Sequence, residues 1–260
     1  MGDLIRKVQV NVPFRLLKEK YLSLVLRNHI NPEIGIDGFS LDRYSSREFS
    51  SIARMLQEEG LSITLHAPFM DMVPGSPDSI MREATRQRLD QAFEMLDIFE
   101  PRSIVCHTGF HERYMSQFDL WLEASVETWR NLLEKSSGTT TKIMFENVYE
   151  SDPGIHLALF NALDSPRMGF CFDIGHWNAF TPRVDVRLWF EALGSFLGQL
   201  HVHDNRGQVD DHLPVGQGNI DFESFFLLLK NFSGLIVTLE PHKEEDIFTS
   251  IEALDIVWPW

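Results

Sequence analysis

The stretch QLHVHDNRGQVDDHLPVGQGNID, residues 199–221, determines how the rest of the chain is interpreted. It starts as an apolar strand that ends in His201-Val202-His203-Asp204, continues through a polar loop with Asp210 and His212, and ends in a glycine-rich turn. Carboxylate and imidazole groups that can bind a divalent cation therefore stand at the end of one strand and in the loop after it.

The same arrangement recurs along the chain, since short strand-forming runs repeatedly end on or near His, Asp or Glu. These runs are VQVNV from Val8, EIGID from Glu33, SITLHA from Ser62, SIVCH from Ser103, KIMFEN from Lys142, MGFCFDIG from Met168, QLHVHD from Gln199 and LIVTLE from Leu235. Amphipathic segments of helical period lie between them, at 45–59, 80–99, 118–135, 186–197 and 222–231. Strand–helix units without a linker predict a single (β/α)8 TIM barrel, an α/β fold, over residues 1–260. An open doubly wound sheet is the alternative, but the chain has no glycine-rich nucleotide motif to support it.

Alternation within the strands predicts which side chains point into the barrel. In SITLHA, Thr64 and His66 share one face, and in LIVTLE, Thr238 and Glu240 do so, while the large apolar residues take the other face. If the bulky face meets the helices, the last inward residue of each strand stands at the C-terminal mouth. Such barrels place their active sites at that mouth.

Composition limits the classes of function. The 260 residues are 43% hydrophobic, which suffices for a large core, and the net charge of −15 disfavours a broad nucleic-acid surface without excluding DNA. Cys106 and Cys171 lie inside predicted strands and are expected to be reduced core thiols. Because no signal-peptide-like or membrane-length apolar run occurs, we expect a cytoplasmic protein with no membrane partner.

The candidate metal ligands stand at strand ends or in the loops that follow, and they are His66, His107, Glu146, Asp173, His176, His201, Asp210, His212 and Glu240. A single such residue is more often a hydrogen-bonded structural group, but burying many unpaired charges would cost several kcal/mol each. Mixed carboxylate and imidazole ligands predict a divalent metal, Zn2+ or Mn2+, with one to three ions. His203 and Asp204 are expected to contact substrate. His242 is expected either to cap a helix or to face the substrate.

The motifs EIGID, LHAPF, CHTGF, FENVYE, FDIGH, LHVHDN, DDHLPVGQGNIDF and TLEPH occur in an order that resembles the xylose isomerase-like TIM barrels. This group includes sugar and sugar-phosphate isomerases and epimerases, and endonuclease IV. The resemblance to the isomerases implies a one-metal site made by Glu146, Asp173, His201 and Glu240. The resemblance to endonuclease IV, which holds three zinc ions, implies further ligands at His66, His107, His176, Asp210 and His212.

The first function that this set supports is isomerisation or epimerisation of a small sugar or sugar phosphate. The metal would stabilise an enediolate, and Glu146 and Glu240 would be the catalytic pair that transfers the proton. The acidic composition and the short loops after EIGID and LHAPF favour this reaction by a narrow margin, because they leave little room for DNA.

The second function is hydrolysis of a phosphoester with two or three ions that generate a hydroxide, either cleavage of DNA at abasic sites, as the resemblance to endonuclease IV implies, or hydrolysis of a small phosphoester. The complete ligand set favours it, and Phe69 and Met70 are expected either to wedge into DNA or to pack at the mouth. Nucleic acid is nevertheless the less favoured partner, because the arginines are scattered: Arg43, Arg47, Arg113, Arg183 and Arg206. A barrel that binds metal or sugar without turnover is a third alternative.

The sequence does not determine the oligomeric state of the protein. The C-terminal Trp258-Pro259-Trp260 and the phenylalanine-rich helical runs are expected either to form a homodimer interface or to pack against the floor of the barrel.

Overall fold

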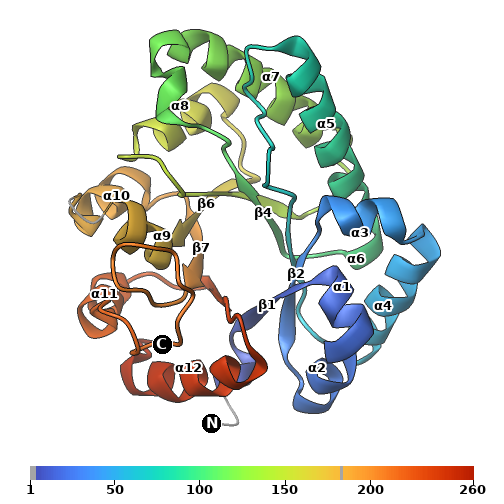
Figure 1. Cartoon of the computed structure of the whole chain (residues 1–260), viewed down its shortest axis with the longest axis vertical. Coiled ribbons are helices and arrows are strands. Elements are labelled where there is room, and N and C mark those ends of the chain that lie inside the picture. The colour runs from blue at the N-terminus through green and yellow to red at the C-terminus, as the bar shows by residue number, and fades with distance from the viewer. Residues whose placement is uncertain (1–3, 182–183) are drawn as a thin grey trace.

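The predicted strand runs form one closed parallel barrel in the order β1 to β8 (Figure 1). The structure, a computed structural model, describes residues 4–181 and 184–260, so Arg183 lies outside the described residues. The TIM barrel is confirmed, and pairing of β1 with β8 excludes the open sheet. The strands are β1 (Gln9–Pro13), β2 (Asn31–Gly35), β3 (Thr64–His66), β4 (Ser103–His107), β5 (Lys142–Glu146), β6 (Met168–Asp173), β7 (Leu197–Val202) and β8 (Ile236–Leu239).

Helices surround the barrel on its outside (Figure 1). The expected amphipathic segments correspond to α4 (Ser46–Glu58), α5 (Ser79–Glu94) with α6 (Leu96–Phe99), α7 (Phe118–Lys135), α10 (Val186–Leu193) and α11 (Phe222–Leu229). The sequence pattern did not single out 3-10 helix η1 (Leu4–Arg6), α1 (Phe14–Leu16), π-helix η2 (Leu17–Tyr21), α2 (Leu22–Asn28), α3 (Gly38–Arg43), 3-10 helix η3 (Glu112–Gln117), α8 (Gly154–Leu163), α9 (Ile174–Phe180) and α12 (Glu244–Val257).

Two kinds of packing lie on the two faces of the strands. Outward side chains meet the helices, as where Phe145 packs against Trp129 at 4.8 Å between ring centroids. Inside the barrel a separate apolar cluster consists of Val105, Met144 and Cys171. Both cysteines are buried and free, as expected. The successive residues Met144 and Phe145 therefore face inward and outward, as strand alternation predicts.

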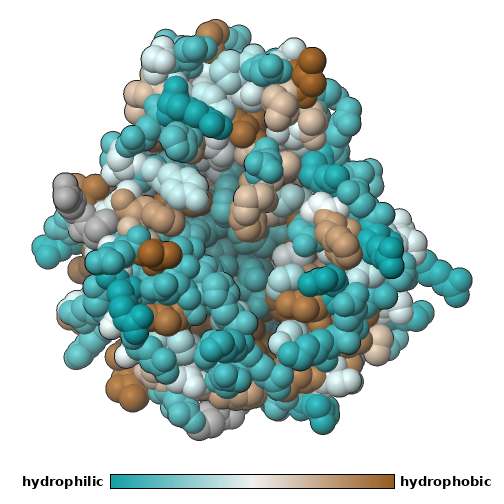
Figure 2. All heavy atoms as spheres, in the orientation of Figure 1, coloured by the Kyte–Doolittle hydropathy of each residue, from teal (hydrophilic) through white to brown (hydrophobic). Residues whose placement is uncertain are grey.

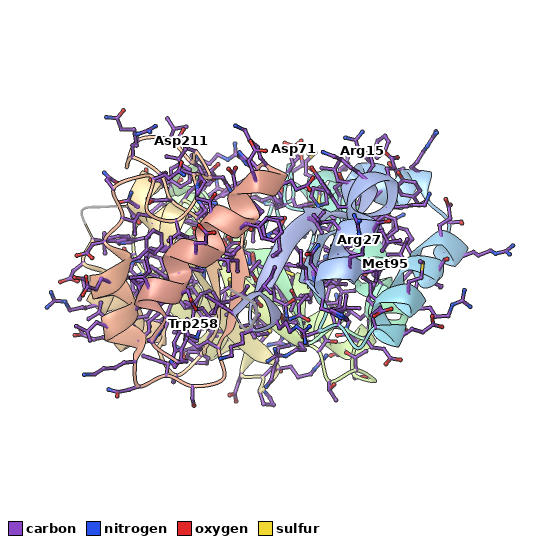
Figure 3. The ribbon with its side chains drawn as sticks, turned by 90° about the horizontal axis from the view of Figure 1, so that it is seen from below. Arg15, Arg27, Asp71, Met95, Asp211 and Trp258 are labelled. Atoms are coloured by element: carbon purple, nitrogen blue, oxygen red, sulfur yellow. The ribbon has the colours of Figure 1, made fainter. Side chains whose placement is uncertain are left out.

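The two ends of the barrel differ. Figure 3 places Arg15, Asp71 and Asp211, each of which follows the C-terminal end of a strand, at one end of the molecule, and Trp258 toward the other. At that other end Trp258 and Trp260 pack against Phe226 of α11, with centroids 6.3 and 6.1 Å away. Among the described helices, none has the length and apolar character needed to cross a bilayer.

Candidate metal centre

Glu146, the last residue of β5, lies at the middle of the candidate site. Its side chain is buried, and its Oε2 lies 3.1 Å from Nε2 of both His66 and His107. Its Oε1 lies 3.2 Å from Nδ1 of His176 and 3.1 Å from Nδ1 of His201. The two oxygens of one carboxylate therefore face two different pairs of imidazoles.

His201, in β7, joins this group to two more carboxylates. Its Nδ1 lies 3.3 Å from Oε1 of Glu240 and 3.8 Å from Oδ2 of Asp173, in addition to its contact with Glu146. Donor atoms of Glu146, Asp173 and His201 all lie within 4.8 Å of one another. The carboxylates of the one-metal site expected from the isomerases, those of Glu146, Asp173 and Glu240, thus converge on Nδ1 of His201.

The loop after β7 brings a third set of donors to the mouth. Oδ2 of Asp210 lies 3.1 Å from Nε2 of His212 and 3.4 Å from Nε2 of His176. His212 has φ +48°, a left-handed conformation that costs a non-glycine residue free energy. Its Nδ1 bonds with the main-chain oxygen of Glu240 at 3.0 Å, which holds the ring toward the site. The structure therefore brings all nine predicted donor residues into one continuous cluster.

A column of stacked imidazoles borders this third set. His203 and His212 stack at 3.9 Å between centroids, and His242 stacks on the other side of His212 at 4.4 Å. Nε2 of His203 lies 3.2 Å from the carboxylate of Asp173. His242 does not cap α12, whose first turn has no side-chain cap. The capping alternative for His242 is therefore not observed, and contact with substrate stays a prediction.

Asp204 anchors the loop instead of facing the donor cluster. Its buried carboxylate accepts four main-chain N–H groups, from Asn205 at 2.9 Å, Gly216 at 3.0 Å, Gly218 at 2.8 Å and Ile220 at 3.2 Å. A Cβ on Gly218 would lie 2.2 Å from Oδ1 of this carboxylate, and Gly216 has φ +83°, so both positions need glycine. Because its acceptor oxygens are engaged by main-chain N–H groups, Asp204 holds the loop in place, and a contact of Asp204 with substrate stays a prediction.

Side chains around the candidate metal ligand Asp173 also determine where α9 begins. The run MGFCFDIG predicts a strand that ends at Asp173 with His176 in a turn, and β6 does end at Asp173, but a helix follows because Oδ1 of Asp173 accepts the N–H of His176 at 2.6 Å and caps α9. Asn147, which sequence reasoning missed, donates to the main-chain oxygen of Asp173 at 3.0 Å and accepts from its N–H at 2.8 Å. A Cβ on Gly175 would lie 1.9 Å from the ring of His203. The signal for Asn147 was its position directly after Glu146.

Charges in the cluster stabilise one another. Burial raises the pKa of Glu146, but the nearby imidazoles of His201 and His107 outweigh it and hold this pKa well below its usual range. Burial lowers the pKa of His176, but Asp173 and further carboxylates raise it well above its ordinary value. The pKa of His212 is raised to about 9 by Asp210, against the effect of burial. Without metal, protons thus occupy this cluster, and a bound cation would displace them.

The face of the molecule at the mouth is hollowed at its centre, and the hollow is mainly hydrophilic (Figure 2). Aromatic side chains stand beside the donors: Phe69 stacks on His107 at 4.7 Å, and Phe180 stacks on His176 at 5.8 Å. Met70 is 72% exposed, so it does not pack at the mouth. Phe69 and Phe180 therefore border the donor cluster.

Comparison with known proteins places the chain among TIM barrels. The model of a family described as xylose isomerase-like TIM barrel matches residues 32–256. An uncharacterized protein of Methanocaldococcus jannaschii is 28% identical over 206 residues, which cover 75% of this chain and 69% of that protein. A probable endonuclease 4 of Mesomycoplasma hyopneumoniae is 26% identical over 182 residues, 62% of each chain.

Solved structures agree on the fold. A D-tagatose 3-epimerase-like protein superimposes with a TM-score of 0.79 at 24% identity, covering 96% of each chain. A protein of Thermus thermophilus, soaked with ZnCl2, gives a TM-score of 0.78 at 22% identity, covering 97% of this chain and 98% of that one. At these identities the likeness shows the barrel alone.

Proposed function

The chain belongs to the family of xylose isomerase-like TIM barrels, and from this premise we propose that it is a metal-dependent enzyme that hydrolyses a phosphoester with two or three divalent ions. The observation that carries the proposal is the placement of Glu146, whose two oxygens face separate imidazole pairs at 3.1–3.2 Å. A carboxylate so placed is suited to bridging two ions. One-metal chemistry would give His66 and His107 no role.

The donor set fits divalent zinc or manganese, because it consists of imidazoles and carboxylates without a thiolate. One ion would be held by His66, His107 and Glu146, in a group whose donor atoms lie within 4.8 Å of one another. The others would be held by Glu146, Asp173, His201 and Glu240, and by His176, Asp210 and His212. When bound, such ions supply Lewis-acid charge that binds a phosphate and makes hydroxide available near neutral pH.

The chain's own residues would prepare this site. Asn147 holds the main chain of Asp173 at the end of β6, and the stacked rings of His203 and His242 keep His212 in one orientation. Because the metal ions would supply the hydroxide, no separate carboxylate base is required in this mechanism.

The substrate proposed is a phosphoester of limited size. The net charge of −15 opposes a long duplex footprint, while the likeness to a probable endonuclease 4 and the exposed side chains of Phe69 and Met70 support DNA with an abasic site as one such substrate.

Sugar isomerisation or epimerisation is the second candidate, and the convergence of Glu146, Asp173 and Glu240 on Nδ1 of His201 favours it. Likeness in fold to an epimerase-like protein agrees with it. From the sequence alone, sugar isomerisation or epimerisation is favoured over phosphoester hydrolysis. The position of Glu146 between two imidazole pairs reverses this order. In this reaction Glu146 and Glu240 would exchange the substrate proton.

Metal content distinguishes the two candidates. Protein purified without chelator should contain two or three ions per chain by elemental analysis, and it should cleave an abasic-site duplex or p-nitrophenyl phosphate. The change His107→Ala should remove one ion and most of the activity. His111→Ala is the matched control and should retain both, because His111 lies in the loop after β4 and its Nδ1 accepts the N–H of Arg113. One ion per chain, with epimerisation of a ketose, would refute the hydrolase.

A further inference from the structure

Directly behind the candidate metal centre, the barrel interior holds a buried carboxylate that the proposed function does not use. Glu33, in β2, has no exposed surface. Its Oε1 accepts from Nδ2 of Asn11 at 3.1 Å and lies 3.0 Å from Nε2 of His201. Its Oε2 accepts from Thr64 at 3.1 Å, from Nε2 of Gln199 at 2.5 Å and from Thr238 at 3.1 Å.

The buried carboxylate of Glu33 has a cost in folding free energy that an apolar side chain at this position would not have. Burying a carboxylate costs several kcal/mol before its hydrogen bonds compensate, and barrels of this kind usually fill their interior with branched apolar side chains. The neighbouring part of this interior is filled in that way by Val105, Met144 and Cys171. The donors to Glu33 come from β1, β3, β7 and β8, so a whole polar layer is directed at one carboxylate.

The orientation of this layer is fixed. Oγ of Ser103 donates to Oε1 of Gln199 at 2.7 Å, which leaves the amide NH2 of Gln199 to face Glu33. With three donors on Oε2 and one amide on Oε1, the remaining acceptor site of Glu33 faces His201. Its oxygens are therefore saturated by donors, and Glu33 is not itself placed to bind a cation.

We propose that Glu33 is a positioning residue for the metal centre, which fixes His201 in the tautomer that carries its proton on Nε2 and presents the lone pair of Nδ1 to the ions. The two ring nitrogens face different environments: Nε2 lies 3.0 Å from Oε1 of Glu33, closer than the NH2 of Gln199 at 3.5 Å, and Nδ1 faces Glu146 and Glu240 at 3.1 and 3.3 Å. A carboxylate behind a ligand histidine also strengthens the ligand, and its loss typically costs 10- to 100-fold in metal affinity. The inference rests on the proposed metal centre but on neither reaction.

Glu33→Gln is the direct test. Because three donors meet at the Oε2 position, the amide oxygen of the new side chain should take that place, and its NH2 should face Nε2 of His201. That contact requires a lone pair on Nε2 and moves the proton to Nδ1, where it blocks the ion. We expect Co2+ affinity, measured by competition with a chromophoric chelator, to fall roughly 10- to 100-fold.

Thr238→Val is the matched control, since it removes one donor to Glu33 but leaves the contact with His201. It should change Co2+ affinity by less than roughly threefold, well below the effect of removing a partner of the ligand. Circular dichroism and urea unfolding of the chelated proteins report whether each variant folds. Unchanged affinity in folded Glu33→Gln overturns the inference.

A second measurement does not depend on any variant. In wild-type protein loaded with Zn2+, nitrogen-15 NMR of the histidine rings should show His201 protonated at Nε2 and metal-bound at Nδ1. Coordination through Nε2 overturns the inference even if Glu33→Gln fails to fold. A chain that binds metal in this way but cleaves no phosphoester refutes only the proposed function, and a wild-type chain that binds no metal refutes both.

Discussion

Replacing Asp204 by asparagine should detach the loop that carries Asp210 and His212 while leaving the barrel folded. The carboxylate of Asp204 accepts four main-chain N–H groups of this loop at 2.8–3.2 Å, two on each oxygen. In Asp204→Asn, one oxygen becomes an NH2 group that faces two N–H donors. Two of the four hydrogen bonds are thus lost, and the remaining two lose the charge that strengthens them.

The size of the effect follows from these contacts. A hydrogen bond to a charged group contributes about 1.5–3 kcal/mol, so the loss of two amounts to about 3–6 kcal/mol of loop stability. A whole domain is stable by only about 5–15 kcal/mol, so opening the loop alone is the cheaper response. The donors on the strands do not depend on this anchor, because Glu146, His66 and His107 lie at the ends of β5, β3 and β4.

Hydrogen exchange and elemental analysis together test this reasoning. In Asp204→Asn, amides of residues 205–220 should exchange at least 100-fold faster, since about 3 kcal/mol corresponds to about two decades, and one ion per chain should be lost. Asp211→Asn, with the same change of charge in the same loop, is the control and should match the wild type. Protected amides together with full metal content in Asp204→Asn would refute the anchoring role.

Further outcomes follow from the cluster. Because the pKa of His212 is raised from 6.5 to about 9, the stability that its protonated ring contributes is complete below pH 6.5 and is lost as the pH rises through 9. In urea titrations, chelated protein should lose up to about 3 kcal/mol of unfolding free energy over this pH range. Metal-loaded protein should not, because the imidazole of His212 is then neutral. Gly175→Ala places a Cβ 1.9 Å from the His203 ring and should cost about 1–3 kcal/mol in the same titrations, whereas Gly138→Ala, with open space around it, should be neutral. Chelation should lower the melting temperature measured by calorimetry, because free metal at a hundred times its dissociation constant stabilises the fold by about 2.7 kcal/mol; an unchanged melting temperature would contradict metal binding by the folded state.

The strand ends could be read from the sequence because alternation and periodicity are local. His66 and Thr64 share a face whatever lies opposite them, and the mouth collects whatever ends the strands. Glu33 carries no comparable signal, since its partners lie 22 to 205 residues away and only closure of the barrel brings them together. The anchoring role of Asp204 could not be predicted from the sequence, because three of the four amides that its carboxylate accepts belong to a turn more than ten residues later.

Glu33 and Asp204 act on two differently supported parts of one centre. Strands carry His66, His107, Glu146 and His201, and Glu33 holds the last of these from within the barrel. The loop carries Asp210 and His212, and its attachment depends on one carboxylate. Rigid strands hold their metal-binding side chains in place before a metal ion binds. The loop must first become ordered, and the entropy lost on ordering reduces the affinity of its side chains for metal. In the proposed metal centre, the strand-borne donors should therefore bind metal more tightly than the loop-borne pair, and the loop should set the number of ions held at a given metal concentration. Since the two proposed reactions, one-metal isomerisation and multi-metal hydrolysis, differ in that number, we expect the anchor at Asp204 to influence which of them the barrel can support.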